Sequence, residues 1–178
     1  MKRFYIILIS SIVLLITLSL GLYLQGKPKL IKNEYDGTDY TFQDIQFDMI
    51  SDDFSPLQDI YDEYKEQGID SLIQFENPEG KDMIIVKEEM NNAYITPEEL
   101  KNPFNIINLQ IQAILNPLKI ELWESDSKII IYSKTIDYEG ITHSMDIFIG
   151  NNYYSISLYG DNLETDVDEI IRTVNIKN

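Results

Sequence analysis

The longest apolar stretch of the chain lies at its N-terminus, where residues 4–24 contain no charged side chain. A helix of these 21 residues rises by roughly 30 Å, which matches the hydrocarbon core of a bilayer. A cleaved signal peptide has a shorter apolar region that ends in small residues, whereas residues 22–24 continue this one. The pattern predicts an uncleaved transmembrane anchor that runs from Phe4 through Leu14 to Leu24.

Basic residues flank this segment on both sides, two before it and Lys27, Lys29 and Lys32 after it. A short N-terminal tail of this kind usually stays in the cytoplasm. We therefore expect residues 1–3 to be a cytoplasmic tail, with a single pass through the cell membrane and an extracytoplasmic remainder. The three lysines are then placed to contact anionic lipid headgroups.

The pattern changes after the apolar stretch. Residues 25–40 contain proline, glycine and scattered charge, which predicts a tether, and residues 41–178 predict a domain. Alternating apolar positions and turn residues divide the first half of this domain into four elements. These are a strand at 44–50, a short helix from Ser55 to Gly68, and a hairpin of strands at 71–77 and 83–89.

A long helical pattern opens the second half of the domain, over residues 97–115. Thr96 and Glu99 have the spacing of a capping box, and Asn102-Pro103 predicts a kink or a break after the first turn. Apolar residues then recur at helical spacing and predict one buried stripe. This stripe consists of Leu100, Phe104, Ile107, Ile111 and Ile114.

Four more strands and a final helix complete the chain. The strands are predicted at 118–124, 128–138, 141–149 and 153–159, and the helix carries Leu163, Val167, Ile170, Ile171 and Val174 on one side. Tight connections between the strands favour an antiparallel meander. The predicted fold class is α+β, with a twisted antiparallel sheet covered by the long and terminal helices.

Charge is divided unevenly along the chain. The whole chain has a net charge of −16, yet residues 1–32 hold five basic and no acidic side chains. Residues 33–178 therefore hold nine basic and 30 acidic side chains, a net charge of −21. Such acidity opposes binding to nucleic acid, whose phosphates need lysine and arginine. It favours attraction of a basic protein.

Cysteine is absent, which excludes disulfides, zinc-thiolate sites, thiol nucleophiles and lipid-modified cysteines. An exported domain without cysteine is more typical of a Gram-positive bacterium than of a eukaryotic secretory pathway. The single histidine, His143, is predicted to pack at the edge of a strand face. Ser144 and Asp146 point to the other face, so no catalytic triad forms. We expect no catalysis and no cofactor.

A dense group of carboxylates occupies residues 161–169. It lacks the spacing of an EF-hand, and helix capping with compensation of the helix dipole explains it better than a calcium site. The carboxylates therefore predict no metal site.

The only tryptophan, Trp123, lies on a predicted strand, where it anchors either the core or a contact surface.

One strand presents the best candidate for a binding surface. Tyr153, Ser155, Ser157 and Tyr159 share one face, opposite three apolar residues. Tyrosine and hydroxyl groups on an open sheet face suit contact with another protein. An ordinary solvated sheet face is the alternative, since tyrosine favours strands in any case.

The order of elements over residues 40–178 resembles the PsbP-like family. The resemblance is carried by the first strand, the hairpin through 77–80, the long helix, and Tyr153-Tyr154-Ser-Ile-Ser-Leu-Tyr159 before the final helix. Residues 52–56 stand where that family has Pro-x-x-Trp. The resemblance implies an α/β/α sandwich and a non-enzymatic accessory role.

Two functions are compatible with these features. The first is a membrane-anchored extracytoplasmic accessory protein that binds another protein. The alternative is an immunity protein that neutralises an exported toxin at the outer membrane face, because an acidic domain attracts a basic partner.

Overall fold

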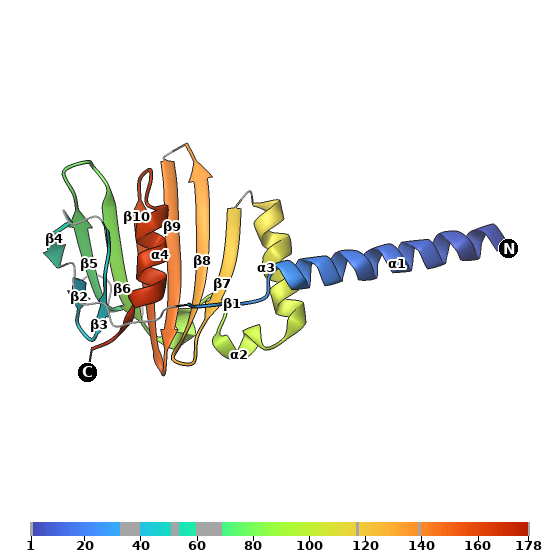
Figure 1. The fold of residues 1–178 in the computed structure, drawn as a ribbon, viewed down its shortest axis with the longest axis horizontal. Coiled ribbons are helices and arrows are strands. Elements are labelled where there is room, and N and C mark those ends of the chain that lie inside the picture. The colour runs from blue at the N-terminus through green and yellow to red at the C-terminus, as the bar shows by residue number, and fades with distance from the viewer. Residues whose placement is uncertain are drawn as a thin grey trace.

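A computed structural model describes residues 2–32, 40–50, 54–59, 69–116, 118–138 and 140–177. Within these ranges a long N-terminal helix projects from an α+β domain, as predicted (Figure 1). The helices are α1 (Lys2–Gln25), α2 (Pro97–Leu100), α3 (Pro103–Leu115), α4 (Glu164–Thr173) and a 3₁₀ turn at Met90–Asn92. The strands are β1 (Lys29–Leu30), β2 (Tyr40–Phe42), β3 (Ile45–Phe47), β4 (Ser55–Asp59), β5 (Ile69–Glu76), β6 (Asp82–Glu88), β7 (Leu118–Glu124), β8 (Lys128–Asp137), β9 (Gly140–Ile149), β10 (Asn152–Tyr159) and β11 (Asn175–Ile176).

An eight-stranded sheet in the order β1-β7-β8-β9-β10-β6-β5-β4 forms the centre of the domain. Strands β7 to β10 make the predicted antiparallel meander, and the predicted β5–β6 hairpin joins it through β10. In the hairpin turn, the Asn77 side-chain oxygen accepts hydrogen bonds from the N–H groups of Glu79 and Lys81. Strand β1 pairs parallel with β7, so the sheet is mixed and the prediction of a wholly antiparallel sheet was wrong.

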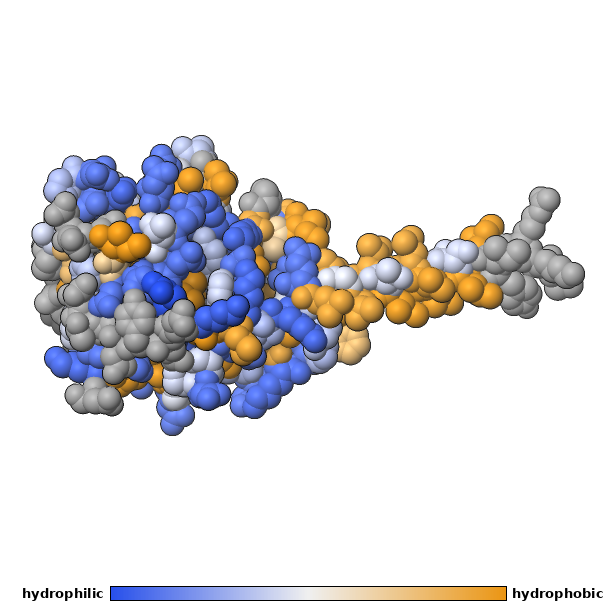
Figure 2. Space-filling model, in the orientation of Figure 1, coloured by the Kyte–Doolittle hydropathy of each residue, from blue (hydrophilic) through white to orange (hydrophobic). Residues whose placement is uncertain are grey.

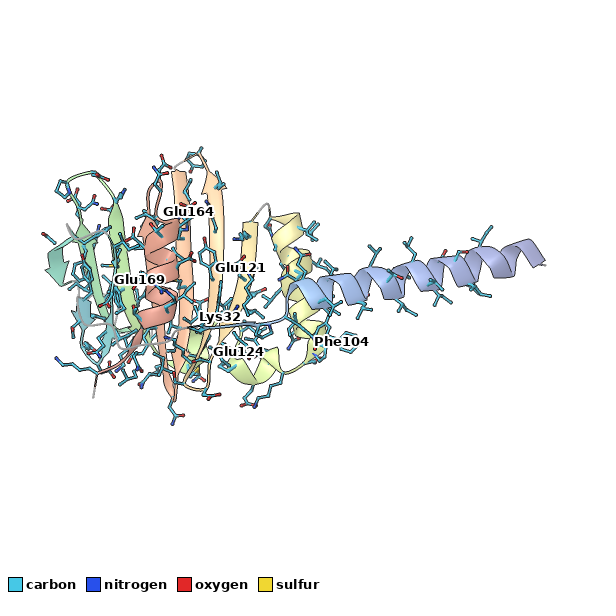
Figure 3. The ribbon with its side chains drawn as sticks, viewed as in Figure 1. Lys32, Phe104, Glu121, Glu124, Glu164 and Glu169 are labelled. Atoms are coloured by element: carbon cyan, nitrogen blue, oxygen red, sulfur yellow. The ribbon has the colours of Figure 1, made fainter. Side chains whose placement is uncertain are left out.

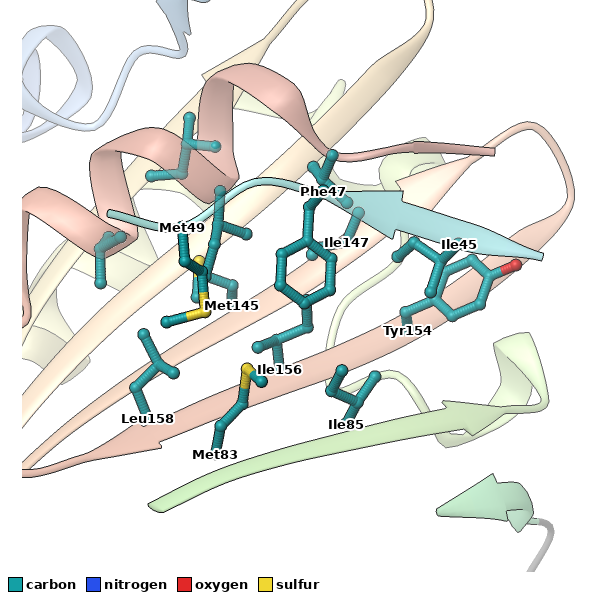
Figure 4. Packing of buried hydrophobic residues seen from close by; sticks show 14 of the residues in the cluster. Ile45, Phe47, Met49, Met83, Ile85, Met145, Ile147, Tyr154, Ile156 and Leu158 are labelled. Atoms are coloured by element: carbon teal, nitrogen blue, oxygen red, sulfur yellow. The ribbon is translucent and has the colours of Figure 1, made fainter. Parts of the chain in front are cut away.

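Helices cover both faces of this sheet. Helix α4 lies over β9 and β10 on one face, and α2 and α3 lie at the β7 side of the sheet (Figure 1). Under α4, the core brings the small-sheet residues Ile45 and Phe47 against Met83, Ile85 and Met145 (Figure 4). A second core on the other face joins α2 and α3 to the sheet through Leu100, Ile106, Leu109, Leu122, Ile131, Phe148 and Tyr153.

The segment before the hairpin differs from the prediction. The first predicted strand is β3, but it belongs to a separate three-stranded sheet in the order β11-β3-β2. Ser55 and Pro56 were predicted to start a helix and instead begin β4, which pairs with β5 at the sheet edge. A proline is tolerated there because an edge strand leaves part of its backbone unpaired. The rest of that predicted helix, residues 60–68, lies outside the described residues.

Two buried side chains of α4 hold the chain that follows β3. The Thr173 hydroxyl accepts a 2.8 Å hydrogen bond from the N–H of Asp48, and a carboxylate oxygen of Asp166 accepts one of 3.0 Å from Ile50. The N-cap of α4 is Leu163, which makes no side-chain cap. The predicted capping by the acidic cluster is therefore wrong, whereas Glu164 and Asp166 lie in the first turn, where negative charge suits the helix dipole as predicted.

Candidate membrane-facing site

Helix α1 carries a span long and apolar enough to cross a membrane, Ile7–Gln25, and none of this span is buried in the protein. Leu14 and Leu24 expose 60% and 56% of their surface. The side chain of Phe4 lies outside the described residues. The predicted N-terminal apolar helix is therefore present, and every side chain from Ile7 to Leu20 is exposed.

The end of α1 is packed closely against α3. The Gly26 N–H continues the helix with a 3.0 Å hydrogen bond to the carbonyl of Leu22. A Cβ atom on Gly26 would lie 2.6 Å from Cγ2 of Ile106 and 2.9 Å from Cγ of Gln110, closer than side chains pack. Only glycine allows this approach. Tyr23, one turn earlier, packs against the same core as α3.

The chain after α1 joins the sheet at once. Lys29 and Leu30 pair with Trp123 and Glu124 of β7, so the described part of the predicted tether, up to Lys32, is built into the domain. The sequence analysis did not predict strand β1, because a strand of two residues is too short to show an alternating pattern. Residues 33–39 lie outside the described residues.

Basic residues at this junction contact aromatic rings and a carboxylate. The Nζ atom of Lys27 lies 5.1 Å from the ring centre of Tyr23, and that of Lys29 lies 4.8 Å from Trp123. Lys29 and Lys119 approach the Glu121 carboxylate at 2.7 and 2.9 Å. Burial raises the pKa of Glu121, but hydrogen bonds and charge from the two lysines outweigh it and leave the pKa below its usual value.

A pocket of about 540 Å³ opens beside this junction, between β1 and α4. Its lining includes the apolar side chains of Trp123 and Ile171 and the basic residues Lys32 and Arg172. Arg172 pairs with Glu169 of α4. Figure 3 shows Lys32 between Glu169 and the base of α1. Lys27 and Lys29 therefore lie at the junction of α1 with the domain, whereas Lys32 lies farther along the sheet toward Glu169 (Figure 3).

Helix α3 is apolar on two sides. Ile106, Leu109 and Ala113 are buried against the sheet. A second set, which we call the outer side of α3, is exposed: Phe104 by 77%, Ile111 by 39%, Ile114 by 67% and Leu115 by 69%. Figure 2 shows hydrophobic side chains along α1 and on the adjoining part of the domain.

The predicted buried stripe of this helix was therefore wrong for three of its five residues, since Leu100 is buried and Ile107 half-buried. Phe104, Ile111 and Ile114 recur at helical spacing, but they form the exposed outer side. Helical periodicity identifies a stripe and does not tell which stripe meets the sheet when both are apolar.

The predicted binding face of β10 is divided between the core and the surface. Tyr153 is buried, stacks on Phe148 with ring centres 5.1 Å apart, and donates a 3.0 Å hydrogen bond to Asp146. Ser155 and Ser157 are half-buried, and Tyr159 is 38% exposed. The expectation that this face points outward holds for Tyr159 alone, because α2 and α3 cover the end that carries Tyr153.

The chemical candidates occupy structural positions. His143 is buried, and its Nδ1 atom lies 2.9 Å from the Tyr132 hydroxyl. Ser144 faces the opposite side of the sheet and lies 3.3 Å from Ser157. Trp123 is partly buried and packs against the core under α4. Within the described ranges, no group of three or more histidine or acidic side chains is arranged to hold a metal ion.

An acidic pocket of about 610 Å³ lies at one end of the sheet, among the turns β5–β6, β8–β9 and β10–α4. Glu79, Asp82 and Asp161 line it together with Tyr159. One lysine, Lys81, lies among them and pairs with Glu79 at 2.8 Å. Ile136, which is 62% exposed, lies near the same end on β8.

No protein-family model matches the chain, and no curated protein matches it.

Proposed function

We propose that the chain is a single-pass membrane protein whose acidic domain lies outside the cytoplasm and binds another protein. The main support for a membrane anchor is the apolar span of α1, none of which is buried in the protein. A helix that exposes an apolar span of this length is suited to lipid, because its backbone polar groups are bonded within the helix. The order of elements that resembles the PsbP-like family supports an accessory role without catalysis.

The acidic pocket is the surface that best fits a protein partner. Glu79, Asp82 and Asp161 give it negative charge, and Tyr159 supplies an aromatic contact of the kind enriched in interfaces. Its carboxylates favour a partner that presents lysine or arginine. This surface replaces the face centred on Tyr153, which the core covers.

Two measurements test the proposal in cells that express the full chain. Alkaline carbonate should leave the protein in the membrane, and protease added to intact cells should remove the domain. Release by carbonate or protection from the protease would contradict the anchored, outward-facing arrangement.

Binding is tested by crosslinking in intact cells and comparison of two charge variants. Glu79→Lys combined with Asp161→Lys should abolish capture of a discrete basic partner, whereas Glu98→Lys, on the exposed surface of α2, should retain it. Equal capture by both variants would remove the acidic pocket from the proposal. If the captured partner is an exported toxin, the immunity function is favoured over the accessory one.

A further inference from the structure

We propose that α3 is an interfacial helix whose outer side, Phe104, Ile111, Ile114 and Leu115, is buried in the lipid leaflet from which α1 emerges. The inference rests on the proposed anchoring by α1 and goes further, because it assigns a second lipid contact and a fixed orientation of the domain. The occupant of the outer side is the bilayer itself.

The length of α1 sets the height of α3 above the membrane. Residues 4–24 rise by roughly 30 Å, which uses the whole apolar stretch to cross the hydrocarbon core. Gly26 follows directly and is held against Ile106 and Gln110 of α3. Because no residues remain to lift the domain away, α3 is placed at the level of the headgroups.

The orientation of α3 presents its outer side to the membrane. The helix runs across the end of α1 and not along it (Figure 1). Phe104 lies on the side of α3 from which α1 leaves (Figure 3). Phe104 near the first turn and Leu115 in the last are exposed by 77% and 69%, so apolar surface extends over the whole helix.

The charge pattern of α3 favours lipid over a protein partner. No charged residue occurs between Lys101 and Lys119, although the domain around it is strongly acidic. The polar residues of the helix, including Asn105, Asn108 and Gln112, are uncharged. No carboxylate of α3 is therefore brought to an anionic headgroup or into a low dielectric, where burial of a charge is costly. A protein partner would have to displace the headgroups that already lie at this level.

The absence of cysteine allows a direct test on the full chain in vesicles made only of lipid. Single cysteines replace Phe104, Leu115, Leu14 or Ile50, and each carries an environment-sensitive fluorophore. Leu14 reports whether α1 is inserted. Ile50 is the matched control, because it is 60% exposed and its N–H bonds to Asp166 of α4, a helix that lies away from α1 (Figure 1).

Lipids that carry a spin label at different depths then quench each fluorophore. We expect the labels at Phe104 and Leu115 to shift to shorter wavelength and to be quenched most by spin labels near the carbonyl end of the acyl chain. The Leu14 label should be quenched most by spin labels near the terminal methyl, and the Ile50 label by none. Circular dichroism of each variant checks that the fold is retained.

Two failures are distinguishable. If the Leu14 label is quenched while Phe104 and Leu115 behave like Ile50, the anchoring stands and the interfacial helix is overturned. The same holds if only one end of α3 responds, since the whole helix is proposed to lie in the interface. If the Leu14 label is not quenched, the anchoring itself is overturned, and the inference falls with it.

Discussion

The Nζ atom of Lys128 donates a 2.8 Å hydrogen bond to the backbone carbonyl of Val174, and a second of 3.0 Å to that of Arg172. Lys128 is almost fully buried at the start of β8, and these carbonyls lie at the C-terminal end of α4. Lys134 lies six residues further along β8, on the same face of the strand. It pairs with Glu164 at the N-terminal end of α4. Two lysines of one strand thus hold both ends of the helix, as cations suit a helix C-terminus and carboxylates its N-terminus.

Replacement of Lys128 by methionine should destabilise the domain by about 2 kcal/mol, because it keeps the apolar stem and leaves buried carbonyls without a donor. Lys134→Met removes only a partly exposed ion pair and should cost less than about 1 kcal/mol. Thermal unfolding of the full chain in detergent micelles, followed by circular dichroism, measures both. Equal losses for the two variants would show that Lys128 does not secure the end of α4.

The contact between Gly26 and Ile106 gives a second prediction. Gly26→Ala places a methyl group 2.6 Å from Ile106 and should destabilise the junction of α1 and α3 by about 1–3 kcal/mol, the range for an overpacked site. Hydrogen exchange of the amides in α3 should become faster. Gly21→Ala is the matched control, because its added methyl meets no atom within 4 Å. Unchanged exchange in Gly26→Ala would contradict the close packing of the two helices.

The helix α3 shows what the sequence could and could not reveal. Its start was predictable, because the cap at Asn102 is a local signal, as is the capping box of Thr96 and Glu99 that starts α2, and both are present. Its orientation was not, since both of its sides are apolar and the choice depends on the sheet and on α1. The same applies to Tyr153, whose strand face was predicted correctly while its cover by α2 and α3 depends on contacts distant in sequence.

Contacts between distant residues also explain the features missed at the junction of α1 with the domain. Gly26 reads in the sequence as the end of a helix, and its partner Ile106 lies far along the chain. Strand β1 is too short to carry a pattern, and it is formed by pairing with β7. By contrast, every residue of the predicted apolar side of α4 is buried, because only one of its sides is apolar.

Asp146 gives a prediction of increased stability. Burial raises the pKa of this carboxyl, the Tyr153 hydrogen bond opposes that rise, and the nearby charge of Glu88 adds to it. Because the folded pKa lies above the unfolded value, the ionised group destabilises the domain at pH 7. Asp146→Asn keeps an acceptor for Tyr153 and should raise the melting temperature at pH 7. The gain should shrink as the pH falls toward 3.8, where wild-type Asp146 is protonated too.

The control for this change is Asp126→Asn, which removes one negative charge from the exposed turn between β7 and β8. It should leave the melting temperature nearly unchanged, because an exposed charge is screened by solvent. A similar rise in both variants would mean that the net charge of the domain, and not the burial of Asp146, sets the effect.

His143 gives the last prediction, which concerns mild acid. Burial lowers its pKa, the charge of Glu164 opposes this, and Lys134 and Lys119 add to the lowering. The folded state therefore resists protonation below about pH 6.5, whereas the unfolded state takes up a proton. Stability contributed by neutral His143 is complete above the unfolded pKa and is lost as the pH falls, by at most about 1.4 kcal/mol per pH unit.

His143→Gln should flatten the loss of stability between pH 7 and pH 5, since glutamine can still accept a hydrogen bond from Tyr132 and does not titrate. Denaturant unfolding of the full chain at each pH measures the slope. Carboxyls with lowered pKa values, such as Glu121, lose their contribution only below about pH 4.5 and do not affect this window. A variant with the same slope as the wild type would show that another group is responsible.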